Sequence, residues 1–244
     1  MGNAVRPGSA LGGTSGSGSR GASGGASGDA PEGTPEFWND LSTEKSWLLL
    51  QELVKEFDFV LIGGWAVFLW TNGLKSKDVD IVVRDYAELD KLRTRFGLKK
   101  NDRLKKYEFS VDEVSVDVYV PYYSQLIVPP HELIKRSERV NGITVVEPHV
   151  LLVLKQAAEL GRRETVKGVK DALDLVFLLR SQRVNLKKYR ELLREIGKKE
   201  FLDELISVVK KLDSANAKYL GLNLRELAVW KKRVLTELRG SNPG

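Results

Sequence analysis

The hydrophobic pattern of the chain changes at Glu147. Before this residue, short apolar runs alternate with helical segments, and after it apolar residues recur only at helical spacing. This change predicts an α/β (α+β) half over residues 38–147, with a mixed sheet and helices, followed by an all-α half over 148–240. Two halves that face each other leave a cleft between them, where small ligands usually bind.

The elements of each half follow from periodicity and turn residues. The first half is expected to contain strands at 57–62, 79–83, 107–111, 114–120, 137–140 and 143–146, with helices at 65–70, 86–96 and about 42–54, the last capped by Ser42 or Thr43. The second half is expected to contain helices at 148–160, 169–180, 187–196, 200–212 and 224–238.

Residues 1–37 differ in composition from both halves. They hold half of the chain's 22 glycines and six serines, so they bury too little apolar surface to offset the entropy of ordering. We expect a disordered Gly/Ser-rich tail that can be deleted without changing the melting temperature. It lacks the apolar segment of a secretory signal, and no apolar run is long enough to span a membrane, so a cytoplasmic protein is expected.

Composition excludes several kinds of site. The chain has no cysteine, which rules out disulfides, zinc–cysteine sites and a thiol nucleophile. Its two histidines, His131 and His149, lie 18 residues apart in unlike contexts, which argues against a histidine metal site or a histidine-based triad. The net charge of +6 favours a polyanionic partner such as nucleic acid or nucleotide phosphates, although 39 basic and 33 acidic residues also fit a solvated mixed surface.

Two aspartates stand at the start of the predicted strand 79–83. Asp78 and Asp80 are two residues apart, so their side chains leave the same face of the strand. Like charges this close repel each other unless a cation lies between them. Mg²⁺ is commonly held by one or two carboxylates together with substrate phosphates. The pair therefore predicts a metal-binding site.

A third carboxylate interrupts the apolar alternation of the strand at 114–120. If this strand lies beside 79–83, Asp117 completes a three-carboxylate cluster with Asp78 and Asp80. The same alternation is also typical of a solvent-facing residue, because Ser115 and Asp117 share a face. The sequence leaves both interpretations open.

Gly63 and Gly64 lie between a predicted strand and a predicted helix. Glycines there let the backbone approach a ligand closely, and a helix N-terminus presents free N–H groups to phosphate. A simple tight turn is the alternative interpretation. Neither a Walker A motif nor a GxGxxG motif is present in residues 38–240, which argues against a P-loop and against a Rossmann dinucleotide site in the two halves.

These motifs together resemble the DNA polymerase β-type nucleotidyltransferase superfamily. In that superfamily a strand ends in two small residues, and an Asp-h-Asp motif (h, hydrophobic) follows; here thirteen residues separate Gly64 from Asp78. A narrower resemblance is to small prokaryotic nucleotidyltransferases that include the AbiEii/MenA toxin group. It covers about 58–180 and includes the runs Lys75-Ser76-Lys77-Asp78-Val79-Asp80, 147–158 and Lys170-Asp171-Ala172-Leu173-Asp174-Leu175.

The resemblance implies an enzyme that moves a nucleoside monophosphate from an NTP, such as ATP, to an acceptor hydroxyl and releases pyrophosphate. It implies that Asp78, Asp80 and Asp117 are catalytic and bind Mg²⁺ or Mn²⁺. It implies a nucleotide site formed by Gly63, Gly64, Ser76, Lys77 and Lys155. The acceptor is an RNA 3′ end (such as tRNA), a protein or a small molecule. The alternatives are a catalytically decayed nucleotide- or RNA-binding module, or a toxin that uses this chemistry and has an antitoxin partner.

Lys155 stands on an otherwise apolar helix. It is either a lysine that snorkels from the edge of the core or a cation directed into the cleft. Asp171 and Asp174 share a helix face and are expected to support the site by pairing with Lys155 or an arginine. From the sequence, Lys155→Ala is expected to lose activity at nearly unchanged stability.

Overall fold

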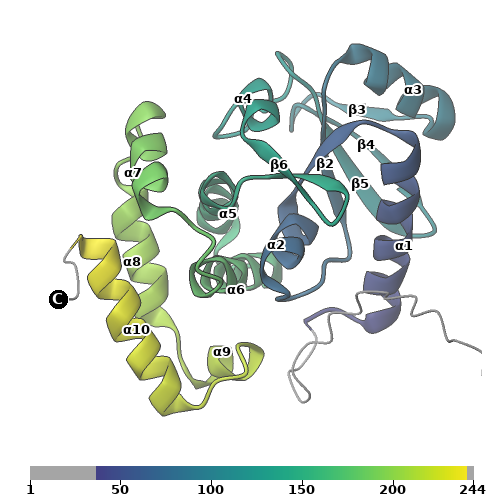
Figure 1. Cartoon of the computed structure of the whole chain (residues 1–244). Helices are drawn as coiled ribbons and strands as arrows, with labels where there is room; N and C mark the ends of the chain where they lie inside the picture. The colour runs from purple at the N-terminus through teal and green to yellow at the C-terminus, as the bar shows by residue number, and fades with distance from the viewer. Residues whose placement is uncertain (1–36, 241–244) are drawn as a thin grey trace, which may run out of the picture.

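A computed structural model describes residues 37–240, which contain one seven-stranded sheet in the order β3-β4-β5-β2-β1-β7-β6 (Figure 1). The predicted tail at 1–37 lies outside the described residues except for Phe37. The Phe37 ring packs against the rings of Trp38 and Tyr219, so Phe37 belongs to the folded part and not to the tail.

The sheet is mixed, as the sequence predicts. β1 pairs antiparallel with β2 and parallel with β7, and β2 pairs parallel with β5. The strands are β1 Phe59–Ile62, β2 Val79–Val83, β3 Lys99–Asn101, β4 Lys106–Val111, β5 Val114–Tyr119, β6 Ser137–Val140 and β7 Ile143–Val146.

Four helices belong to the first half, and the chain from Pro148 to Arg239 forms helices and no strand, which confirms the predicted all-α second half. The first four are α1 Asp40–Glu56, α2 Gly63–Thr71, α3 Tyr86–Phe96 and α4 Pro130–Lys135. The others are α5 Pro148–Arg162, α6 Val166–Arg180, α7 Leu186–Glu195, α8 Phe201–Lys211, α9 Ser214–Tyr219 and α10 Leu224–Arg239.

Three short elements were not predicted. β3 has the sequence Lys-Lys-Asn and forms only because it pairs with β4. α4 and α9 have six residues each, which is too short for helical periodicity to show. The predicted cap of α1 was also wrong, because Asn39 accepts the capping hydrogen bond and both Ser42 and Thr43 lie inside the helix.

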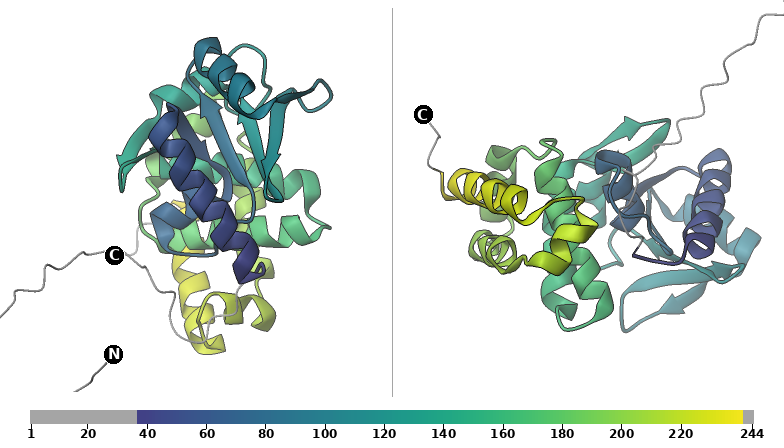
Figure 2. Two further views of the ribbon diagram at one scale, coloured as in Figure 1. Left: turned by 90° about the vertical axis from the view of Figure 1, so that its right-hand side faces the viewer. Right: turned by 90° about the horizontal axis from the view of Figure 1, so that it is seen from below.

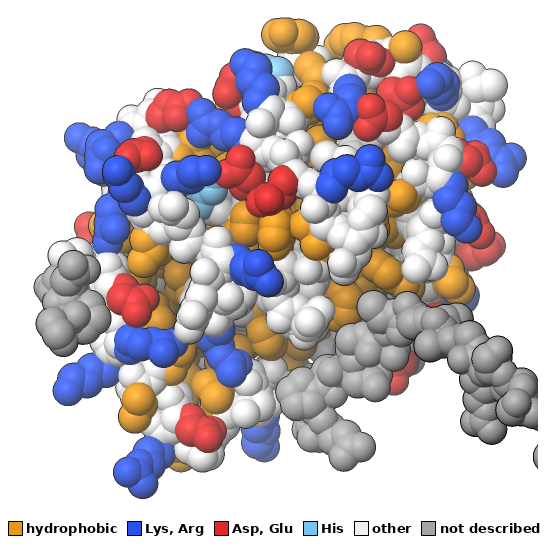
Figure 3. All heavy atoms as spheres, in the orientation of Figure 1, with side chains coloured by type: hydrophobic (Ala, Val, Ile, Leu, Met, Phe, Trp, Pro, Cys, Tyr) orange, Lys and Arg blue, Asp and Glu red, His pale blue; other side chains and the backbone are white. Residues whose placement is uncertain are grey.

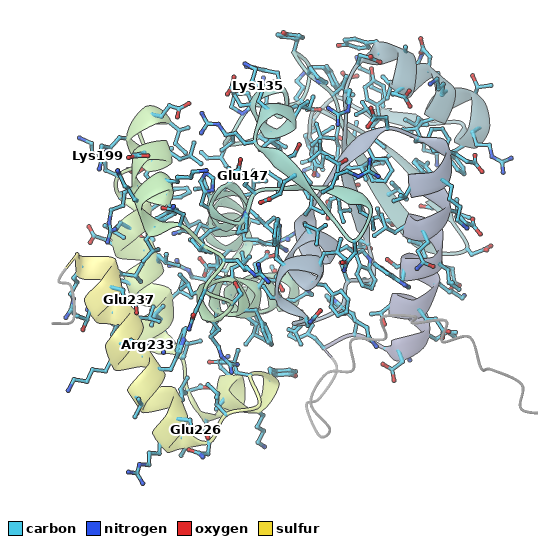
Figure 4. All side chains as sticks on the ribbon, in the orientation of Figure 1. Lys135, Glu147, Lys199, Glu226, Arg233 and Glu237 are labelled. Atoms are coloured by element: carbon cyan, nitrogen blue, oxygen red, sulfur yellow. The ribbon has the colours of Figure 1, made fainter. Side chains whose placement is uncertain are left out.

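The helices form layers at increasing distance from the sheet. α5 and α6 pack against each other and against α2, while α7, α8 and α10 lie farther out (Figures 1 and 2). Figure 4 shows Arg233 and Glu237 on α10, on the side of the molecule remote from the sheet. One hydrophobic core runs through both halves and includes Leu61 and Val116 of the sheet and Leu151 of α5. The two halves are therefore packed into one body.

Charge is mixed on the face shown in Figure 3, where lysines, arginines and acidic residues are interspersed. This face fits the solvated mixed surface that the sequence left open. Within residues 37–240, no helix combines the length and apolar character needed to cross a bilayer.

Candidate active site

The three predicted carboxylates come together at the wall of one cavity. β2 and β5 run parallel with Asp80 directly opposite Asp117, so both side chains leave the same face of the sheet. Asp78, one residue before β2, lines the same cavity of about 350 Å³. Val116 and Val118 fill the core on the other face of β5. The face of β5 that does not pack on the core is therefore the face that lines the site. Asp117 is thus a residue of the open strand face and also lies with the other two aspartates.

The carboxyl group of Asp80 is the most strongly perturbed acid of the site. Burial of the group, followed by the negative charge of Asp117, raises the pKa of Asp80 to about 6. Asp78 acts in the same direction, whereas Lys155 and Arg162 oppose it. The ionised form of Asp80 is thus disfavoured, and a bound cation would stabilise it.

Two lysines act as counter-ions for the other carboxylates. The Lys106 ammonium lies 2.5 Å from Asp117 Oδ1, and the Lys167 ammonium lies 2.8 Å from Asp78 Oδ2. In the described part of the chain, no three His, Cys, Asp or Glu side chains are gathered closely enough to hold a metal ion. The predicted three-carboxylate metal cluster is therefore not assembled in this arrangement, because lysines hold the two outer carboxylates.

The donor set nevertheless fits a hard divalent cation. Mg²⁺ needs only one or two carboxylates when substrate phosphates complete its coordination. Asp80 and Asp117 are neighbours on adjacent strands and line one cavity, and Lys155 and Arg162 compensate the anionic form of Asp80 only in part. These two residues could hold Mg²⁺ or Mn²⁺, with Asp78 joining them on release from Lys167.

The two glycines leave no room for a side chain. Gly63 begins α2 with φ at +71°, and a Cβ atom there would lie 2.0 Å from Asp80 Oδ2. A Cβ atom on Gly64 would lie 2.6 Å from Ser76 Oγ and 3.3 Å from the Lys170 ammonium. No side chain caps α2, so its first N–H groups are available where both glycines line the cavity. The strained turn and the close approach both require glycine at position 63.

Gly63→Ala should strongly reduce activity, because the added methyl group displaces the Asp80 carboxylate. The matched control is Gly197→Ala, where φ is +68° but nothing lies within 4 Å of the new Cβ. Each variant has backbone strain of about 1–2 kcal/mol, and only Gly63→Ala has the steric clash. Thermal melts and transfer assays on both variants check this. Equal activity in the two variants would contradict the assignment of Gly63 to the site.

Lys155 lies at the cavity wall and is only 6% exposed, which excludes a lysine that snorkels to the surface. Its ammonium is 3.1 Å from Asp171 Oδ1 and 2.7 Å from Asp174 Oδ2. The pairing expected from the sequence is therefore present. Burial lowers the pKa of Lys155, but Asp174 and Asp171 outweigh burial and raise it above the ordinary value.

Two further cations complete this buried network. Arg162 Nε lies 2.7 Å from Asp171 Oδ2, and the Lys170 ammonium lies 3.0 Å from each oxygen of Asp174. Burial lowers the pKa of Lys170. Arg162 and Lys170 both line the cavity, whereas Asp174 lies behind the wall and positions the lysines.

Lys77 is the predicted nucleotide-binding residue that does not line the cavity. Its ammonium lies over the Trp38 ring, 4.5 Å from the ring centroid. The Trp38 ring lines the cavity, so Lys77 lies beside the cavity without lining it. Ser76 itself is buried, and its hydroxyl donates to the carbonyl oxygen of Asp78.

Sequence reasoning missed five residues of the site and its borders. Arg162 and Lys170 stood within or beside the runs that carry the resemblance, so that signal could have found them. Trp38, Lys106 and Lys167 carry no local signal, because only the fold brings them to the carboxylates.

Comparisons with known proteins leave the family open. No protein-family model matches the chain, and no curated protein matches it. The narrower resemblance to the AbiEii/MenA group therefore stays a prediction.

Several solved structures are similar to this one. A candidate nucleotidyltransferase from Helicobacter pylori is 16% identical, with 85% of this chain and 100% of that chain covered and a TM-score of 0.46. JHP933 from Helicobacter pylori is 16% identical, with 83% and 95% covered and a TM-score of 0.44. The Megavirus polyadenylate synthase is 13% identical, with 59% and 32% covered and a TM-score of 0.41. At such low scores, function has to be inferred from the site itself.

Proposed function

We propose that this chain is a metal-dependent nucleotidyltransferase that moves a nucleoside monophosphate from an NTP to an acceptor hydroxyl. One observation carries the proposal. Asp80 and Asp117 face each other in register on one wall of a cavity, next to the glycine N-terminus of α2. Carboxylates that can hold Mg²⁺ beside a phosphate-binding helix terminus suit a triphosphate substrate.

The cations of the cavity would hold the triphosphate. The N–H groups at Gly63 and Gly64 and the Ser76 hydroxyl lie at one wall, and Lys155 and Arg162 lie at another. Buried aspartates fix Lys155 and Arg162 in position, so little reorganisation is needed when phosphate binds. Lys77 is not part of this set.

The carboxylates would carry the chemical step. Asp80 and Asp117, with Asp78, would hold Mg²⁺ or Mn²⁺, which when bound neutralises negative charge on the reacting phosphates. The acceptor oxygen forms a bond to the α-phosphorus, the bond to the bridging oxygen of the β-phosphate breaks, and pyrophosphate leaves. Asp117 would accept or orient the acceptor proton.

The alternatives differ in what they predict. A decayed module that only binds nucleotides or RNA should lack part of the carboxylate set, yet all three aspartates line the cavity. A toxin with an antitoxin partner uses the same chemistry, and this role rests on the sequence resemblance alone.

The test is incubation with each α-labelled NTP, Mg²⁺ and either total RNA or total protein. Label should enter one acceptor pool, and chelation of the metal should abolish the transfer. A γ-labelled NTP should leave no label on the acceptor, because pyrophosphate is released. Nucleotide binding without any transfer would favour the decayed module, and transfer of γ-label would contradict the proposed reaction.

A further inference from the structure

A second cavity, of about 500 Å³, adjoins the first at the carboxylates. It shares Asp78, Asp117 and Lys167 with the first cavity and extends over β3, β4 and β5. Figures 1 and 2 place β3 and β4 at the end of the sheet far from α7, α8 and α10, so those helices do not cover this groove.

Strand register leads from the groove directly to the active site. Lys99 lies opposite Glu108, Glu108 opposite Asp117, and Asp117 opposite Asp80. Directly opposed residues share a face, so the four side chains form one row from the edge of the sheet to the carboxylates. One end of a ligand that lies along the groove would therefore reach Asp117.

The lining of the groove combines charged side chains of both signs with hydroxyls and, at one end, an aromatic ring. Lys99, Lys106 and Lys167 line it together with Asp78, Glu108 and Asp117, and the segment 99–106 at its border holds five basic residues against one acidic residue, Asp102. The Phe96 ring, stacked on Phe109 with centroids 4.4 Å apart, forms the apolar end. The exposed pair Ser110 and Ser115, directly opposite each other, adds two hydroxyls.

We propose that this groove binds the end of a single-stranded nucleic acid as the acceptor, an inference that rests on the proposed function. The phosphates of the strand would lie on the lysines, a base would lie against Phe96, and the terminal hydroxyl would reach Asp117. Lys106 and Lys167 now pair with Asp117 and Asp78, and metal binding to these carboxylates would release the Lys167 ammonium for phosphate, while Lys106 keeps a second partner, Glu108, at 3.3 Å.

The chemistry favours a nucleic acid over a peptide or a small acceptor. With Asp78 and Asp117 bound to metal, the three lysines of the lining outnumber Glu108, and cations beside the Phe96 ring suit the phosphates and bases of a strand. The groove is open to solvent at the sheet edge, where Lys99 is exposed. A small acceptor needs no such extension.

The test measures strand binding by the full chain with Mg²⁺ and without NTP. Fluorescence anisotropy follows 5′-labelled RNA and DNA strands of about 12 nucleotides, within the site sizes of single-strand binding proteins. Lys99→Glu should weaken binding roughly tenfold, as expected for a lost charge-assisted contact, and should reduce the salt slope by about 1. The matched control is Lys187→Glu on α7, with the same charge change at an exposed residue outside the groove.

A second variant tests the groove without changing charge. Ser110→Trp should fill the groove from an exposed position and weaken binding comparably, while nucleotide binding in the first cavity stays at the wild-type level. RNA and DNA arms show which strand is preferred, and labelling from α-labelled NTP shows whether the bound strand is the acceptor.

Three results would overturn the inference: no strand binding at low salt, equal weakening by Lys99→Glu and Lys187→Glu, or label that enters protein and not the strand. Nucleotide binding and nucleotidyl transfer are measured separately from strand binding in each of these cases. Loss of the proposed function would instead appear as absent transfer to every acceptor, with strand binding still sensitive to Lys99→Glu.

Discussion

Asp80→Asn is expected to abolish nucleotidyl transfer and, near neutral pH, to stabilise the metal-free protein. Transfer is lost because Asp80 is the central carboxylate of the site and asparagine carries no charge to hold a divalent cation. Stability rises because burial, Asp117 and Asp78 disfavour the ionised carboxylate that wild type carries above pH 6. The gain is at most roughly 3 kcal/mol, the free energy equivalent of the pKa shift.

The sign of the pH dependence follows from linkage. The pKa of Asp80 is raised to about 6 in the folded protein, while the unfolded chain keeps the ordinary value near 4. Between these values the unfolded state loses its proton first, so wild type loses stability as pH rises through this window. The stabilising effect of Asp80→Asn should therefore be full above about pH 6 and vanish near pH 4.

Urea unfolding without metal at several pH values, together with transfer assays, measures both effects. The matched control is Asp90→Asn, which removes the charge of an exposed aspartate of α3 that pairs with Arg93 at the surface. It should change neither activity nor the pH profile. Transfer at the wild-type rate by Asp80→Asn would end the proposed mechanism.

Lys155→Ala is expected to lose both activity and stability. The sequence alone led to the expectation of nearly unchanged stability, and the structure argues against it because Lys155 is buried and bound to two buried aspartates. Removing one partner of a buried ion pair costs about 3–5 kcal/mol. Arg162 and Lys170 still contact the aspartates, so the lower end of this range is expected. Transition-state binding should also fall by roughly 10- to 150-fold.

The matched control is Lys167→Ala. Lys167 also pairs with an aspartate of the site, Asp78, but its side chain is 47% exposed. Loss of such a pair costs less than about 1 kcal/mol. Denaturant unfolding compares the two variants, and equal losses of stability would show that the buried network contributes no more than a surface pair.

Local sequence determined most of the elements, because apolar periodicity and turn residues act over a few residues. The hairpin of β6 and β7 has the predicted bounds, and α3 likewise coincides with its prediction. The exceptions have physical causes. β3 is polar and depends on its partner strand, and α4 and α9 are too short to show a period.

The sequence by itself also identified the glycines and the first two aspartates of the site. Two glycines, Gly63 and Gly64, begin α2, and two aspartates, Asp78 and Asp80, stand just before and within β2. The glycines and aspartates lie near each other because β1 and β2 pair antiparallel, with Ile62 opposite Asp80. Alternation placed both aspartates on one face. It could not exclude Lys77, which lies in the irregular segment before β2 and contacts the Trp38 ring without lining the cavity.

Only the tertiary structure decided what surrounds the aspartates. Asp117 joins Asp80 because β5 pairs with β2 although β3 and β4 lie between them in the sequence, and no local pattern specifies that order. Lys155 faces the cavity because α5 packs against α2 and α6. Lys167 reaches Asp78 across 89 positions of chain. These contacts are non-local, so their energies depend on packing and strand pairing and are not encoded in any short run of residues.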